Sequence, residues 1–173
     1  MSDAVALGPI VPILRIFDIA KAKELLGKAG LAQGFTINMD VRNTSPTKDL
    51  AQAIQATWAE AGVKVELLPA DNAQTLTKYR ARQHDVYIGQ WGPDYQDPNT
   101  NAETFAANYD NGDAPPAKTL AWRNAWDIPQ MTKTTQAAVL ERDGAKRSEI
   151  YQALQREHQK VSPFVIMAQQ IET

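Results

Sequence analysis

The feature that most constrains this chain is a repeated alternation of strand-like and helix-like segments in its first half. Apolar residues occupy every second position of 35–41 and of 63–67, a period that is typical of half-buried strands. A third short run, 86–91, is rich in β-branched and aromatic residues. Helical segments over 46–61 and 72–82 separate the three runs. Strands that are joined through helices are normally parallel, so this order predicts an α/β fold with a mainly parallel sheet flanked by helices.

The boundaries of the helices follow from residues with strong positional preferences. Asp18 is a suitable N-cap for a helix over 19–29 that closes at Gly30. Pro46 suits the first turn of the helix between the first two strands. The helical spacing there also predicts which side chains face inward. They are Leu50, Ala53, Ile54, Thr57 and Trp58.

The second half of the chain is expected to be mainly helical. Its helices are predicted over 102–107, 117–126, 131–140 and 143–160, and a strand over 164–171 follows Pro163. We therefore expect a single domain, 1–173, with four parts. They are an extended leading segment (1–16), a βαβ core (17–107), a helical region (117–162) and a return strand (163–173).

Composition argues against several classes of function. The formal net charge of -2 is unfavourable for nucleic-acid binding, which usually needs a basic surface. Cysteine is absent, which excludes disulfides, thiol catalysis and cysteine metal sites. Neither histidine has a metal-like partner at helical spacing, so we expect no metal and no cofactor. His84 is expected to form a helix-terminal charge pair with Asp85, and His158 is expected to be solvated on a charged helix.

The strongest candidate site follows the third predicted strand. Trp91 and Tyr95 supply aromatic surface there, and Asp94 and Asp97 supply carboxylates. Ligands of α/β proteins bind beyond the carboxyl ends of the strands, so this position favours a ligand-binding role. An aromatic ring beside an acid suits an apolar ligand that carries a positive charge. Arg42 ends the first strand and would face the same cleft in a parallel sheet.

Other interpretations of this segment stay open. Asp94 with Asp97 or Glu103 could cooperate in hydrolysis, as in a small α/β hydrolase-like enzyme. Such an enzyme needs a self-contained cavity and a carboxylate with a raised pKa. A protein-interaction domain would instead expose an apolar patch around Trp91. The Gly-Pro and Asp-Pro pairs of the segment also form ordinary turns, which would make it purely structural.

Four segments carry a resemblance to a known family. They are FDIAKAKELLGKAG at 17–30 with GF at 34–35, IQATWAEAGVKVE at 54–66, GQWGPDYQDP at 89–98, and SPFVIM at 162–167. The third is the most specific and is similar to a "GW-x-x-DY-x-DP" motif. Together they resemble the carboxyl-terminal lobe of the solute-binding proteins of ABC transporters that capture dipeptides, oligopeptides and related compounds.

The resemblance implies a lobe of the type II periplasmic binding protein fold, and a function in transport rather than catalysis. The whole receptor would have two lobes that close around a ligand, so an amino-terminal lobe is missing here. It would then deliver the ligand to the membrane subunits of an ABC permease, in the periplasm or at the outer face of the cytoplasmic membrane.

The same resemblance implies roles for individual residues. Asp94 matches the acid that pairs with the α-ammonium group of a peptide ligand, and Trp91 would form a wall of the cavity. Tyr95 and Arg42 are further candidates for ligand contact. Ile88 stands where some peptide binders carry an arginine that receives a carboxylate. This difference leaves opines, nickel chelates and sugars open beside peptides.

Overall fold

The computed structural model describes residues 18–168. The predicted leading segment and the end of the predicted return strand, 169–173, lie outside the described residues. The elements in chain order are α1 (Ile19–Lys28), β1 (Phe35–Arg42), α2 (Thr47–Glu60), β2 (Val63–Ala70), α3 (Asn72–Arg80), β3 (Val86–Tyr87), α4 (Pro98–Ala106), α5 (Leu120–Arg123), α6 (Pro129–Leu140) and α7 (Gly144–Val161).

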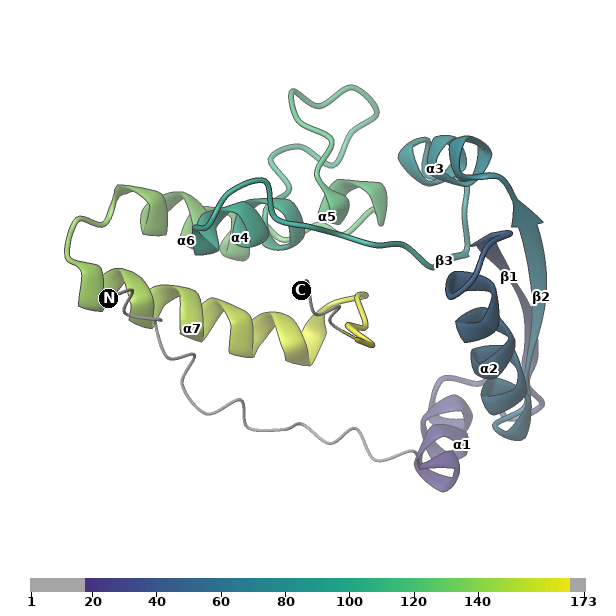
Figure 1. Ribbon diagram of the computed structural model, residues 1–173. Coiled ribbons are helices and arrows are strands. Elements are labelled where there is room, and N and C mark those ends of the chain that lie inside the picture. The colour runs from purple at the N-terminus through teal and green to yellow at the C-terminus, as the bar shows by residue number, and fades with distance from the viewer. Residues whose placement is uncertain (1–17, 169–173) are drawn as a thin grey trace, which may run out of the picture.

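The predicted parallel sheet is confirmed. β1 pairs in parallel with both other strands, which gives the order β2-β1-β3. Phe35 lies opposite Val63 and Arg42 lies opposite Ala70, so β1 and β2 begin and end level with each other. The carboxyl ends of the strands therefore share one edge of the sheet, which α3 and the chain leading from β3 to α4 border (Figure 1).

The third strand is much shorter than the predicted 86–91. β3 is limited to Val86–Tyr87, and only the Ile88 amide extends the pairing, by donating to the carbonyl oxygen of Asp40 at 3.4 Å. The chain then leaves the sheet at Gly89, because glycine has no side chain that could pack on the sheet surface. Trp91 consequently lies in a loop and not at the end of a strand.

One face of the sheet is covered by α1 and α2. Leu26 of α1 and Ile54 and Trp58 of α2 pack against the apolar side chains of the strands. The buried members of this cluster are Met39, Val41, Ala51, Val63, Val65 and Ile88. The predicted inward face of α2 was partly wrong, since Leu50 and Ala53 are exposed. The helix begins at Thr47, and the residues on the same face of the helix as Thr47 are the ones that contact the sheet.

The other face of the sheet contacts α3. Asp71 caps this helix by accepting from the Gln74 amide at 2.8 Å. The ring of Tyr79 stacks on Tyr87 of β3 with 4.2 Å between the centroids, and Thr75 is fully buried. These contacts fix α3 beside the carboxyl ends of β1 and β3.

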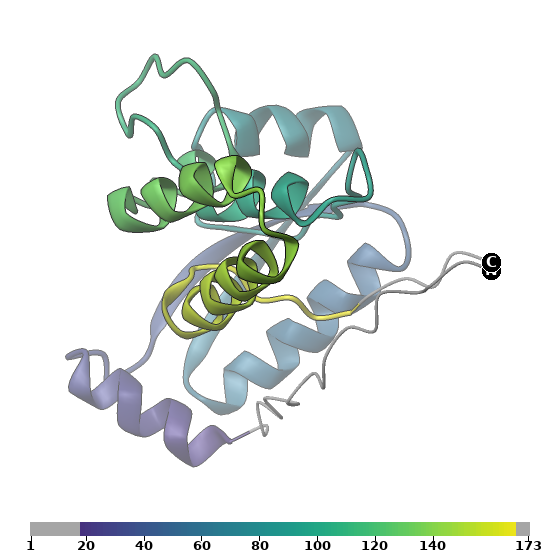
Figure 2. The same cartoon turned by 90° about the vertical axis from the view of Figure 1, so that its left-hand side faces the viewer.

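The helices α4 to α7 form a second apolar cluster beside the sheet. In Figure 2 this part faces the viewer, with α7 in the foreground. Its buried members are Ala102, Ala106, Ala121, Ile128, Met131, Ala138, Tyr151 and Leu154. Thus α4, expected at the end of the βαβ core, contributes to the helical part. Whether the whole chain forms a single domain stays a prediction.

Two elements of the helical part differ from the predicted ones. α5 is confined to Leu120–Arg123 because Ala125 adopts a positive φ of 51°, which ends the helix before Trp126. The predicted return strand is wrong over 164–168, where the described chain forms no strand. Pro163 cannot donate a ladder hydrogen bond, and no other strand lies alongside this segment in the described residues.

Candidate functional site

The candidate site is built around the chain that links β3 to α4, which we call the 88–97 loop. It starts at the carboxyl edge of the sheet and ends where Asp97 caps α4. It therefore joins the sheet to the helical part (Figure 1). Three of the four predicted ligand-binding residues, Trp91, Asp94 and Tyr95, lie on this loop.

Trp91 is oriented by α4 and keeps much of its surface free. Its indole Nε1 donates to Oδ1 of Asn101 at 2.9 Å. The ring also meets Phe105 edge to face, with 5.8 Å between the centroids. The side chain is nevertheless 40% exposed. Trp91 thus presents an aromatic surface whose direction is set by one helix.

Asp94 and Tyr95 are both exposed. Within residues 18–168, the Asp94 carboxylate has no hydrogen-bond or ion-pair partner. The Tyr95 ring is likewise available, at 51% exposure, while its carbonyl oxygen accepts from the Asp97 amide at 2.9 Å. The loop therefore carries a free negative charge between two accessible aromatic rings, which suits a ligand with a cationic group.

Asp97, by contrast, is committed to structure. Its Oδ1 accepts from the Asn99 amide at 2.8 Å as the N-cap of α4, and the carboxylate forms an ion pair with Arg147 of α7. The hydrogen bond from Arg147, followed by the one from the Asn99 amide, lowers the pKa of Asp97. A hydrolase built on Asp94 and Asp97 would need a carboxylate with a raised pKa. The lowered pKa of Asp97 is the opposite of this requirement.

Arg42 ends β1 at the same edge of the sheet, where the Asn43 amide donates to the Ala70 carbonyl oxygen at 2.9 Å. The side chain is half-buried, and its Nε is buried without a hydrogen-bond partner among the described residues. No ion pair or hydrogen bond in this part of the chain links Arg42 to the 88–97 loop. Arg42 thus lies at the carboxyl end of β1, whereas Asp94 lies three residues before the α4 cap Asp97, toward the helical end of the loop.

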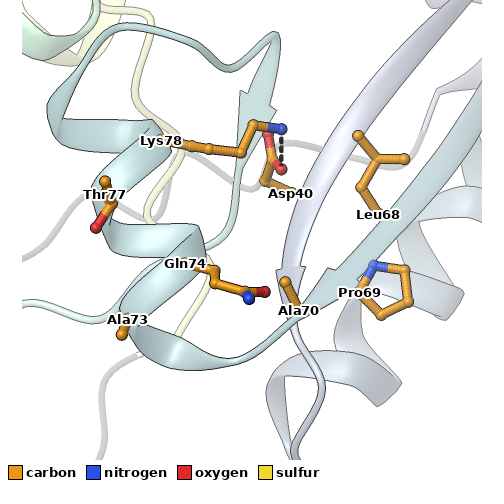
Figure 3. A pocket seen from close by; sticks show the side chains of 8 residues that line it. All are labelled: Asp40, Leu68, Pro69, Ala70, Ala73, Gln74, Thr77 and Lys78. Atoms are coloured by element: carbon orange, nitrogen blue, oxygen red, sulfur yellow. Dashed lines mark hydrogen bonds and ion pairs between the residues drawn. The ribbon is translucent and has the colours of Figure 1, made fainter.

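A shallow hollow lies between α3 and the ends of β1 and β2 (Figure 3), and no motif predicted it. It is lined by Asp40, Leu68, Pro69, Ala70, Ala73, Gln74, Thr77 and Lys78. Asp40 is buried, and Lys78 Nζ donates to its Oδ1 at 2.5 Å. A buried carboxylate needs such a partner, so this pair has a structural role. None of the four predicted ligand-binding residues lines the hollow.

Both histidines differ from their predicted environments. His84 lies 3.3 Å from Oδ1 of Asn124 through Nε2, while Asp85 accepts from Asn38, so the predicted charge pair does not form. His158 is half-buried rather than solvated and stacks on Phe164 with 5.8 Å between the centroids. Helical spacing missed this because Phe164 lies beyond the end of α7. Over the described residues, no three or more His, Cys, Asp or Glu side chains gather to hold a metal ion.

The architecture has clear counterparts among solved structures. The periplasmic binding protein DppA of Helicobacter pylori, in complex with the peptide STSA, matches with a TM-score of 0.73 at 24% identity over 83% of this chain and 27% of that one. HbpA2 of Haemophilus parasuis matches with a TM-score of 0.74 at 23% identity, over 84% and 28% of the two chains. The fold is therefore that of a periplasmic binding protein lobe, as the resemblance implied.

The amino-acid sequence defines the family more closely. Residues 3–113 match the family described as bacterial extracellular solute-binding proteins, family 5 Middle, and the chain belongs to this family. The Di/tripeptide-binding protein 3 of Pseudomonas aeruginosa is 32% identical over 145 residues, which cover 80% of this chain and 26% of that protein. The Dipeptide-binding protein of Escherichia coli is 26% identical over 88% of this chain and 28% of its own length.

These relatives are solute-binding proteins and not enzymes. The chain spans only about a quarter of their length, 26% for the Pseudomonas aeruginosa protein. This partial coverage fits the expectation that an amino-terminal lobe is missing. None of the helices within 18–168 is long and apolar enough to cross a bilayer.

Proposed function

We propose that this chain is the carboxyl-terminal lobe of the substrate-binding component of an ABC importer. The whole receptor captures a small, peptide-like solute in the cleft between its lobes and delivers it to the membrane permease. It acts in the periplasm or at the outer face of the cytoplasmic membrane. Membership of the solute-binding family and the peptide-binding relatives support this assignment.

The observation that carries the proposal is the unpartnered carboxylate of Asp94 beside Trp91. In the proposed complex, Asp94 binds the ligand's ammonium group, and the rings of Trp91 and Tyr95 line the apolar part of the cavity. A desolvated ammonium group needs a counter-charge, because burying it alone is costly. The exposed position of Asp94 on the 88–97 loop leaves it free to provide that charge.

Arg42 has the complementary chemistry. In a free peptide the ammonium and carboxylate groups lie at opposite ends of the molecule. Arg42 lies at the carboxyl end of β1 and Asp94 lies on the 88–97 loop, and no ion pair among the described residues neutralises either of them. A ligand carboxylate would give a partner to the buried Nε of Arg42.

The enzyme alternative is not favoured by these observations. Asp97 is held as a helix cap and by Arg147, so it is not available to cooperate with Asp94 in hydrolysis. The hollow between α3 and the sheet contains neither residue. The relatives that the chain resembles are binding proteins.

The proposal is tested with Asp94→Asn in the full-length protein that contains this lobe. The substitution keeps the size of the side chain and removes its charge. We expect the affinity for the dipeptide Met-Leu, measured by isothermal titration calorimetry, to fall roughly 30-fold or more, as when a buried charge pair is broken. Met-Leu is a reasonable probe because a dipeptide-binding protein of similar fold was solved with it.

Glu60→Gln is the matched control. Glu60 is an exposed carboxylate at the end of α2, far along the chain from the 88–97 loop and at the opposite edge of the sheet. We expect this variant to bind Met-Leu like the wild type. An Asp94→Asn protein that binds with unchanged affinity would remove Asp94 from the binding site.

A further inference from the structure

The 88–97 loop is fixed to α7 by a bidentate ion pair. Arg147 donates from Nη2 to Asp97 Oδ1 at 2.8 Å and from Nη1 to Asp97 Oδ2 at 3.1 Å. The two side chains are only 25% and 34% exposed. A bidentate arginine–carboxylate pair defines an orientation as well as a distance, unlike a single contact between flexible side chains.

Arg147 is itself held in place from several directions. Its Nε donates to the carbonyl oxygen of Ala138 in α6 at 3.2 Å, and its guanidinium lies 4.9 Å from the centre of the Tyr151 ring. The Tyr151 hydroxyl donates in turn to Oδ1 of Asn99 in α4 at 3.2 Å. These contacts tie three helices to the same cation. Arg147 is therefore a fixed anchor and not a mobile surface charge.

Arg147 anchors the loop close to its two main candidate ligand-binding residues. Asp94 precedes Asp97 by three residues, which is a chain distance of at most about 11 Å. Trp91 is oriented by Asn101, one turn into the helix that Asp97 caps. Freeing Asp97 would release both the loop end and the start of α4.

We propose that Arg147 is a positioning residue for ligand binding: through Asp97 it holds the 88–97 loop in the conformation in which Asp94 meets the ligand's ammonium group. The inference rests on the function proposed above and deepens it. Arg147 does not touch the ligand. It reduces the number of loop conformations that binding would otherwise have to order, and such preorganisation strengthens affinity.

The test compares Met-Leu with N-acetyl-Met-Leu in the full-length protein. The second probe lacks the ammonium group, so the ratio of the two affinities reports on the Asp94 contact. We expect Arg147→Met to weaken Met-Leu binding about tenfold. We also expect it to reduce the preference for the free amine, which a loss of stability alone would not change. Thermal unfolding is measured in parallel.

Three further variants separate the mechanism from a general effect on folding. Arg156→Met removes an exposed charge from the same helix and should leave both affinities unchanged. Arg147→Lys keeps the charge, so it should retain part of the preference for the free amine. This variant serves as the test even if Arg147→Met folds poorly. Asp97→Asn should reproduce the loss, and adding Arg147→Met to it should cause little further change, because both substitutions break one interaction.

The outcomes distinguish the two proposals. A wild-type protein that binds neither probe overturns the proposed peptide-binding function and this inference with it. A wild-type protein that binds both probes equally keeps peptide binding but overturns the Asp94–ammonium contact, and with it the positioning role of Arg147. A wild-type protein that prefers the free amine, together with Arg147 variants whose preference equals that of Arg156→Met, overturns only the positioning role.

Discussion

At the scale of single residues, the 88–97 loop separates two carboxylates that look alike in the sequence. Asp94 is exposed and without a partner in the described part of the chain, whereas Asp97 caps α4 and binds Arg147. The motif predicted that these acids and the neighbouring aromatic rings contribute to a ligand-binding site, and that role stays a prediction. It could not predict which acid was committed, because the partner of Asp97 lies 50 residues further along the chain. Long-range ion pairs of this kind leave no local signature in a sequence.

His158 provides a prediction of pH dependence at the same scale. Burial against Phe164 and Trp126 lowers its pKa, since desolvation disfavours the charged imidazolium. The unfolded chain binds a proton near the ordinary pKa of about 6.5, and the folded protein does so only at lower pH. The unfolded state therefore holds more protons in this interval. We expect the free energy of unfolding to fall as the pH is lowered below about 6.5.

The measurement is urea unfolding of the wild type and of His158→Phe between pH 7.5 and about 5. Phenylalanine keeps an aromatic ring for stacking but cannot titrate. We expect the variant to lose less stability over this interval than the wild type does. Identical pH profiles for the two proteins would show that His158 does not contribute.

At the scale of elements, the first half of the fold was predictable and the second half was less so. β1 and β2 alternate in polarity and carry their own start and stop residues, so local pattern was sufficient. β3 has only two residues in the sheet, and its limit is set by how the chain leaves toward α4. The shortness of α5 likewise depends on the conformation of Ala125. The candidate site lies in this less predictable region.

The alignment of β1 with β2 leads to a second prediction. Gly34 and Gly62 precede the two strands, and both have positive φ, 75° and 95°. A Cβ on Gly34 would lie 2.0 Å from the carbonyl oxygen of Gly62. We expect Gly34→Ala to lower the free energy of unfolding by about 3 kcal/mol or more, because the clash adds to backbone strain. The free energy of unfolding is measured by urea denaturation monitored by circular dichroism.

Gly27→Ala is the control for this substitution. Gly27 lies in α1, and nothing is within 4 Å of the position that its Cβ would take. Alanine favours the helix by up to about 1 kcal/mol, so this variant should be slightly more stable than the wild type. Equal stabilities of the two variants would contradict the close approach of the strands.

At the scale of the whole molecule, the 88–97 loop occupies the junction between two packed parts. The sheet with α1 to α3 has one apolar cluster, and α4 to α7 have another. The loop is fixed at its end by Asp97, which caps α4, and Arg42 lies at the carboxyl end of β1 in the sheet. Because Arg42 belongs to the sheet and Asp94 lies near the start of α4, only a ligand that reached both residues would contact both parts of this lobe. In a two-lobed receptor it would meet the second lobe across the cleft.

This arrangement predicts that ligand binding closes the full-length receptor. A single lobe leaves one side of the ligand in water, and closure around it excludes that water and adds contacts from the second lobe. We expect the radius of gyration, measured by small-angle X-ray scattering, to decrease when Met-Leu is added to the wild type. Asp94→Asn should show no decrease at the same peptide concentration, whereas Glu60→Gln should respond like the wild type. A wild-type protein that binds Met-Leu without any compaction would contradict a closing cleft while leaving Asp94 as a ligand contact.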